Sequence, residues 1–264
     1  MYRPDNLCVI ITGSIDEAEL LETMEAFDAQ LPALPSTPNP RPFIDSPASH
    51  IEPLTESQVV KVDFPDKDES MGELLISWIG PPAGDLLINV AVDTAGAYFS
   101  DLPISILNKQ LVEVENPSAT DIDYTTDDYL RTTMSFTFNG VPTEKLDSLD
   151  KHIKLILLEH SDPAVFDLAY MKQILKNQRL KFISSTEKLP LLFSNIAISE
   201  FIYGNPDGLD LSKWIKDLKE YDVLDNWTAD QWCALIRQYF CENHSITILG
   251  YPSAKLNREI KAAD

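Results

Sequence analysis

The histidines are the first candidates for metal chemistry, and their spacing does not suit zinc. A zinc site needs several His, Cys or carboxylate ligands that converge at fixed spacing. The chain contains four histidines: His50, His152, His160 and His244. None belongs to an H-x-x-E-H or H-E-x-x-H motif, because Ile156 stands where a motif ending in Glu159-His160 would need histidine. His152 and His160 would be about 12 Å apart along a helix, too far to share one metal ion. We therefore expect surface or helix-end histidines and no metal residue.

The three cysteines are the candidates for nucleophilic catalysis or disulfide bonding. Cys8, Cys233 and Cys241 are an odd set without C-x-x-C spacing, which fits neither a disulfide framework nor a zinc knuckle. A reducing intracellular compartment fits best. A catalytic thiol needs an activating base, whereas Cys8 lies in an apolar run and the other two lie among residues such as Trp232 and Phe240. We expect buried, unreactive thiols.

The sequence also lacks motifs for nucleotide binding and a convincing pair of residues for acid-base catalysis. The chain has 9 glycines, no P-loop and no G-x-G-x-x-G, so the usual backbone cradle for nucleotide phosphates is absent. Carboxylate pairs such as Asp121 with Asp123 are expected by chance in so acidic a chain, and turn or solvation roles are favoured over acid-base catalysis. No catalytic residue is predicted.

Charge and composition restrict the partners. The chain has 42 acidic and 21 basic residues, a formal net charge of -21. Nucleic acid is not expected as a partner, because phosphate binding draws on clustered Lys and Arg. Such acidity could steer cationic peptides, and a merely well-solvated surface is the alternative. No apolar run approaches the roughly 20 residues of a membrane helix, so no membrane association is expected.

Periodicity predicts strands and helices in irregular alternation. Short β-type apolar runs, with clear alternation in residues 130–139, predict strands: residues 7–13, 59–64, 72–79, 120–124, 130–139 and 245–249. Helical spacing and capping residues predict helices: residues 16–31, 86–99, 104–112, 143–159, 163–182, 187–203, 211–221 and 228–239. Between Pro32 and Pro53, seven prolines predict an extended surface linker. We see no internal repeat. The mixture favours an α+β fold, a sheet of about five or six mostly antiparallel strands covered by helices.

Several stretches in this order resemble the inactive second domain of the pitrilysin/insulinase family of zinc metallopeptidases. Residues 2–16 resemble the family's Y-x-P-x-N-…-G-x-(V/I)-D segment, where the chain leaves the first domain. Residues 78–81, 98–100 and 104–113 resemble its later strand and helix pair. Residues 245–253 resemble the G-x-P-S segment that closes the second domain in the single-chain, presequence-protease-like branch.

The resemblance implies a LuxS/MPP-like metallopeptidase fold, with residues 1–264 as a single domain. It also implies a parent protein that degrades peptides in a closed chamber, with zinc held by an H-x-x-E-H motif on its first domain. That motif is absent here, so no cofactor is expected in this chain and zinc is implied for the parent alone. The expected partners are the other domains of the parent chain and a peptide substrate.

The resemblance also implies substrate-binding residues. In some family members a loop and a strand of this domain hold the amino terminus of the substrate. The matching positions are residues 100–103 and 120–123, which makes Asp101, Asp121 and Asp123 the candidates. Ordinary exposed loop acids are the alternative.

The leading hypothesis is therefore a non-catalytic, structural and substrate-enclosing domain of an intracellular zinc metallopeptidase, with the cytoplasm placed ahead of the mitochondrial matrix. The first alternative is a zinc-less scaffold or assembly subunit of the same fold, and the second is a free-standing enzyme with an unrecognised site. An H-x-x-E-H motif upstream of Tyr2 would separate the peptidase from the scaffold. The isolated chain is expected to be inactive.

Overall fold

The computed structural model describes residues 7–31, 54–127, 129–185, 189–205, 211, 214–215 and 218–263. These residues fall into two compact units, one within Met1–Ile51 and Leu180–Lys216 and the other within Glu52–Arg179 and Asp217–Asp264. The predicted proline-rich linker, residues 32–53, lies outside the described residues. The assignment of residues 1–264 to a single domain stays a prediction.

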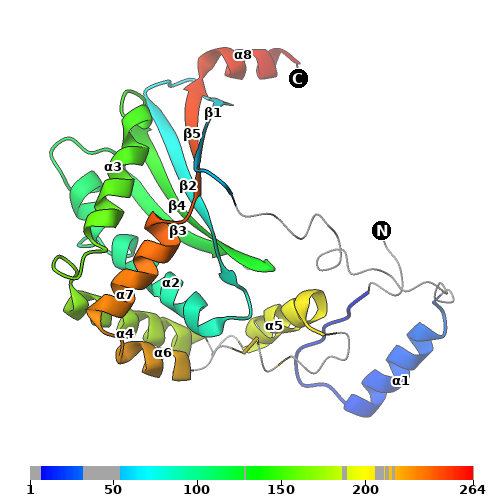
Figure 1. Cartoon of the computed structure of the whole chain (residues 1–264). Helices are drawn as coiled ribbons and strands as arrows, with labels where there is room; N and C mark the ends of the chain where they lie inside the picture. Colours follow the sequence, from blue (N-terminus) through cyan, green and yellow to red (C-terminus); the bar gives the residue numbers. More distant parts are fainter. Residues whose placement is uncertain are drawn as a thin grey trace. The chain divides into compact units, whose positions relative to one another are not determined.

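The larger unit is built on one five-stranded mixed sheet with the order β1-β5-β2-β4-β3 (Figure 1). The strand bounds are as follows: β1 Gln58–Pro65, β2 Met71–Pro82, β3 Asp121–Asp127, β4 Arg131–Pro142 and β5 Ser245–Ser253. β1 pairs parallel with β5, and the other neighbours pair antiparallel. The α+β fold with a mostly antiparallel sheet is confirmed.

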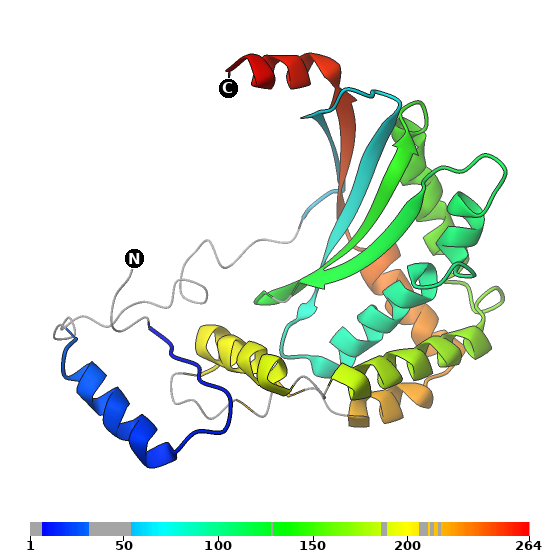
Figure 2. The ribbon, with the colours of Figure 1, turned by 180° about the vertical axis from the view of Figure 1, so that it is seen from behind.

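Helices cover one face of this sheet, and Figure 2 shows it from behind. The helices of the larger unit, of which α4 extends into the smaller one, have these bounds: α2 Leu86–Ser100, the π-helix η3 Asn108–Val112, α3 Leu146–Glu159, α4 Leu168–Ser185, α6 Leu218–Asp225, α7 Ala229–Ile236, the π-helix η6 Arg237–Cys241, and α8 Ala254–Ala263. The smaller unit contains α1 Glu17–Asp28 and α5 Leu189–Tyr203. Along β2 and β4 every second side chain is buried beneath the helices. The alternate side chains stay half-buried, so the opposite face of the sheet is open.

The helix α2 lies closest to the centre of the core. Of its 15 residues, 11 are buried, which fits its nearly continuous apolar sequence. The Asp85 side chain caps it by accepting a hydrogen bond from the Ile88 amide, with a donor–acceptor distance of 3.3 Å. Of the helices in the described part of the chain, none has the length and apolar character of a membrane span.

The contact between α2 and β3 is made through a glycine and a tyrosine. A side chain on Gly96 would collide with the Tyr124 ring, so the ring packs directly on the helix backbone. The Tyr124 hydroxyl donates a hydrogen bond to the Val92 carbonyl at 3.2 Å. Beneath it, the Phe136 ring centroid is 4.9 Å from that of Tyr124 and 6.0 Å from that of Phe240. Such aromatic pairs contribute about 0.5–1.5 kcal/mol each beyond their buried area.

Two predicted elements are wrong. Residues 7–13 form no strand in the described structure, because an extended segment becomes a strand only when a partner accepts its backbone hydrogen bonds. The helix predicted over residues 163–182 begins instead at Leu168. The Asp162 carboxylate accepts from the Ala164 amide and closes a local turn, and Asp167 accepts from the Tyr170 amide at the true helix start.

The Gly96 contact yields a stability test. The substitution Gly96→Ala should lower the free energy of unfolding by about 1–3 kcal/mol, because the new methyl group must displace the Tyr124 ring. Helix propensity alone would give the opposite sign, a gain of about 1 kcal/mol. Gly84→Ala is the matched control, since nothing lies within 4 Å of the added carbon. Denaturant unfolding measures both; equal midpoints for the two variants would contradict the contact.

Candidate binding groove beside β3

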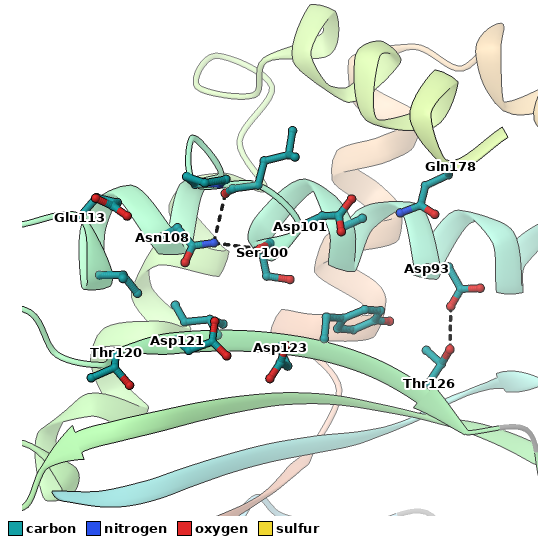
Figure 3. A pocket seen from close by; sticks show the side chains of 16 residues that line it. Asp93, Ser100, Asp101, Asn108, Glu113, Thr120, Asp121, Asp123, Thr126 and Gln178 are labelled. Carbon is teal, nitrogen blue, oxygen red and sulfur yellow. Dashed lines mark hydrogen bonds between the residues drawn. The ribbon is translucent and has the colours of Figure 1, made fainter. Parts of the chain in front are cut away.

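A groove of about 530 Å³ lies between the edge strand β3 and the helix layer formed by α2 and η3 (Figure 3). Its lining is acidic and contains five carboxylates: Asp93, Asp101, Glu113, Asp121 and Asp123. No Lys or Arg is among the described residues that line it. The groove therefore suits a cationic or hydrogen-bond-donating ligand.

The structure brings the three predicted binding residues to this one groove. Asp101 is the C-cap residue of α2, and its backbone amide donates to the Ala97 carbonyl. Asp121 and Asp123 are exposed and alternate along β3 with Ile122 and Tyr124, whose side chains pack towards α2. Because side chains alternate along a strand, those of Asp121 and Asp123 point to the face of the sheet opposite α2, where the Asp123 carboxylate accepts a hydrogen bond from the Asn139 side-chain amide at 3.3 Å. Asp121 and Asp123 therefore border the groove along β3, and Asp101 lines it from the helix layer.

Two acidic residues of the groove were missed from sequence. The Asp93 carboxylate accepts a hydrogen bond from the Thr126 hydroxyl at 2.9 Å and so links α2 to β3. Glu113 directly follows η3. The spacing of Asp93, Ala97 and Asp101, four residues apart, places them on one face of α2 and was the available signal. No sequence signal pointed to Glu113, because the π-helical turn before it shifts the helical periodicity.

Asn108 fixes the loop that carries Asp101. Its side-chain amide lies 2.8 Å from the Ser100 carbonyl, 3.1 Å from the Leu102 carbonyl and 2.9 Å from the Ser105 hydroxyl. Asn108 opens the π-helix η3, a type of distortion that is frequent at functional sites. One side chain therefore holds residues 100–105 against the groove.

The backbone of β3 adds a second kind of binding group. β3 is the last strand in the sheet order, and among the described residues only β4 pairs with it. The amides and carbonyls on its outer edge are therefore free of strand partners. Such an edge can accept an extended peptide as an additional strand.

The groove does not resemble a metal centre. Its carboxylates are spread along its length (Figure 3), and no group of three or more His, Cys, Asp or Glu in the described part of the chain could hold a metal ion. His160 ends α3 and packs edge-on against Phe99, and burial lowers its pKa. His152 and His244 are exposed, and His50 lies outside the described residues.

Comparison with known proteins identifies the family. The profile of the peptidase M16 inactive domain family matches residues 1–162. The chain belongs to the peptidase M16 inactive domain family. The resemblance to inactive domains of pitrilysin/insulinase peptidases is thereby confirmed.

The relatives of this M16 domain are much longer proteins. It is 37% identical over 99% of its length to the uncharacterised protein YOL098C of Saccharomyces cerevisiae, of which it covers 25%. An uncharacterised protein of Schizosaccharomyces pombe is 28% identical over the same share of the chain, again covering 25% of that protein. The chain thus spans a quarter of the length of these relatives.

Solved structures share the fold at low sequence identity. A protease from Helicobacter pylori matches 90% of the chain with a TM-score of 0.62 and 16% identity, over 53% of that protein. A peptidase M16 inactive domain from Pseudomonas fluorescens gives a TM-score of 0.61 and 12% identity, with 90% of this chain and 52% of that one covered. The periplasmic protease PqqL of Escherichia coli gives 0.59 and 13%, with coverages of 91% and 25%.

The cysteines differ from expectation at one position. Cys233 is buried, Cys241 is partly buried, and burial raises the pKa of each thiol to about 11. Cys8, which was expected to be buried, is exposed, because residues 7–13 pair with no strand among the described residues. A neutral buried thiol is a poor nucleophile, so neither Cys233 nor Cys241 suits catalysis.

Thiol labelling tests this assignment. At pH 8 the raised pKa keeps Cys233 and Cys241 protonated in the folded chain, and their reactivity should rise only as the pH approaches about 11 or the chain unfolds. Cys8 should react at once, and Cys8→Ser should remove the fast phase. Equal labelling rates for all three cysteines in the folded chain at pH 8 would contradict the burial.

Proposed function

We propose that this chain is a non-catalytic, structural and substrate-enclosing domain of an intracellular zinc metallopeptidase that degrades peptides. Its membership of the M16 inactive domain family supports the non-catalytic role. The unpaired cysteines support a reducing compartment, and we place the protein in the cytoplasm ahead of the mitochondrial matrix. Zinc would belong to another part of the parent protein.

The observation that carries the proposal is the acidic groove beside the open edge of β3. An extended peptide that pairs with β3 would run along a row of carboxylates, with Asp121 and Asp123 on the strand itself. Asp101, held in place through Asn108, faces the groove from the helix layer and suits the positively charged amino terminus of the peptide. Strand pairing supplies sequence-independent affinity, and the carboxylates supply preference for cationic ends.

A protein of similar fold gives a precedent for a bound protein partner. The ferredoxin protease FusC, as its E83A mutant, has been crystallised in complex with Arabidopsis ferredoxin. Its fold matches 90% of this chain with a TM-score of 0.54 and 16% identity, over 24% of that protein. A zinc-less scaffold subunit, the alternative function, would need no peptide site in this groove.

Peptide titration tests the groove. The probe is a lysine-rich peptide long enough to pair with the seven residues of β3, with a free or an acetylated amino terminus. We expect acetylation to weaken binding at fixed salt, and the double substitution Asp121→Asn, Asp123→Asn to weaken it about 3–10-fold, since exposed charge pairs contribute about 0.2–1 kcal/mol each. Asp225→Asn, an exposed acid outside the groove lining, is the matched control.

The salt dependence of peptide binding separates long-range electrostatic attraction from specific binding of the amino terminus. Raising the salt from about 0.1 M to about 1 M shortens the Debye length from about 10 Å to about 3 Å and should weaken long-range attraction. Affinity that is independent of salt would contradict steering by the acidic surface. Equal affinity for the free and the acetylated peptide would contradict an amino-terminus site, and equal losses in the groove and control variants would contradict the groove itself.

A further inference from the structure

A second cavity, of about 530 Å³, lies on the surface of α7 and η6 and shares no lining residue with the groove beside β3. Its lining includes the charged residues Asp230, Arg237 and Glu242 and the small residues Pro163 and Ala234. All five are exposed, and all belong to the larger unit. The volume lies within the range of about 300–1,000 Å³ that is usual for small-ligand pockets. The cavity is therefore large enough for a small ligand.

The spacing of the lining residues explains why they share one side of the helix. Ala234 follows Asp230 by four positions, and Arg237 follows Ala234 by three, so the three are neighbours along one face of α7. Glu242 comes five positions after Arg237 and would point elsewhere from an α-helix. In the π-helical turn of η6 the Glu242 amide donates to the Arg237 carbonyl at 2.8 Å, so Glu242 lies one turn beyond Arg237. The π-helical turn therefore completes the cavity.

A buried serine orients Arg237. Ser161 is fully buried, and its hydroxyl donates a hydrogen bond to the Leu158 carbonyl at 2.7 Å. The Ser161 oxygen accepts a hydrogen bond from Arg237 Nε at 3.3 Å, so the guanidinium is held from one side. The ion pairs between the described residues do not include Arg237. The two terminal nitrogens of Arg237 are therefore available to a ligand in the cavity.

The charges of the cavity favour a ligand with groups of both signs. A guanidinium binds a carboxylate through two parallel hydrogen bonds, so Arg237 suits a carboxylate group. The carboxylates of Asp230 and Glu242 line the same cavity and would repel a simple anion such as phosphate. The same two carboxylates suit an ammonium group. The cavity therefore suits a zwitterion, a molecule that carries both a carboxylate and an ammonium group.

We propose that this cavity binds a dipeptide with free ends, which places its carboxylate on Arg237 and its ammonium group on Asp230. The seven positions between these two residues correspond to a rise of about 10.5 Å along the helix axis. Side chains on a helix lean towards its N-terminus, and the longer arginine closes part of that distance. An extended dipeptide spans about 7 Å, whereas a single amino acid is too short to reach both residues. The proposal is independent of peptide binding beside β3.

Titration of the 264-residue chain with the dipeptide alanyl-alanine tests the site. The NMR signal of the Ala234 backbone amide should shift as the dipeptide binds, because Ala234 lies between the two charged residues. Arg237→Gln should weaken the binding about 10-fold, since two hydrogen bonds to a charged group are lost. Arg258→Gln, which changes an exposed arginine of α8 outside the cavity, is the matched control and should leave the affinity unchanged.

Blocked dipeptides test the two contacts without any change to the protein. Amidation of the carboxyl group should weaken the binding about 10-fold, because the amide has no charge and only one acceptor oxygen for the guanidinium. Acetylation of the amino group should weaken it about 3-fold, since an exposed charge pair contributes less, and Asp230→Asn should remove that difference. Inorganic phosphate should bind more weakly than the dipeptide.

The opposite results would overturn the proposal. An Ala234 signal that does not shift would show that the dipeptide does not bind in the cavity. Equal affinity for the free and the amidated dipeptide, or equal affinity of the Arg237→Gln and Arg258→Gln variants, would show that Arg237 binds no carboxylate. Phosphate that binds as tightly as the dipeptide would make the cavity a simple anion site. If Arg237→Gln does not fold, the blocked dipeptides still decide the question on the unchanged chain.

Discussion

The direct packing of the Tyr124 ring on the backbone of α2 is the contact on which the binding groove depends. It is available only because Gly96 carries no side chain, and it sets the separation between α2 and β3. The Val92 carbonyl and the Asp93 carboxylate extend this contact with hydrogen bonds to Tyr124 and Thr126. Phe136 of β4 packs against Tyr124 and Phe240, so β3, β4 and α2 hold one side of the groove in a fixed arrangement.

The one-sided covering of the sheet leaves a surface that suits the peptide binding proposed above. Helices bury one face, and the other face and the β3 edge remain accessible to a ligand. With a net charge of -21, the surface repels anions and attracts cationic chains over the range of the Debye length. Enclosure and orientation of a peptide need only such a surface, whereas cleavage needs ligands and a base that the described residues do not gather.

The sequence was informative where the signal is local. The alternation in residues 130–139 predicted β4, and the helix predicted at residues 228–239 is present as α7 and η6. The sequence predicted the wrong structure for segments whose conformation depends on contacts with distant parts of the chain. Residues 7–13 have the apolar run typical of a strand but form one only with a partner. The helix predicted from residue 163 begins at Leu168, where Asp167 accepts from the Tyr170 amide, because the Asp162 carboxylate closes a turn with Ala164 instead.

Only some of the acidic residues of the groove could be predicted, because the groove itself is formed by tertiary contacts. Asp101, Asp121 and Asp123 came from resemblance, and the structure places them on one groove. The spacing of Asp93 and Asp101 places both on one face of α2, but the hydrogen bond from Thr126 to Asp93 depends on the approach of α2 to β3, which no local pattern encodes.

The central claim is that this M16 domain contributes a binding surface and no catalytic centre. The most direct test incubates the extensively dialysed 264-residue chain with equimolar zinc and a mixture of peptides and follows cleavage by mass spectrometry. The account predicts no cleavage above background, with or without zinc, because no three ligands converge among the described residues. Zinc-dependent cleavage that a chelator abolishes would contradict it.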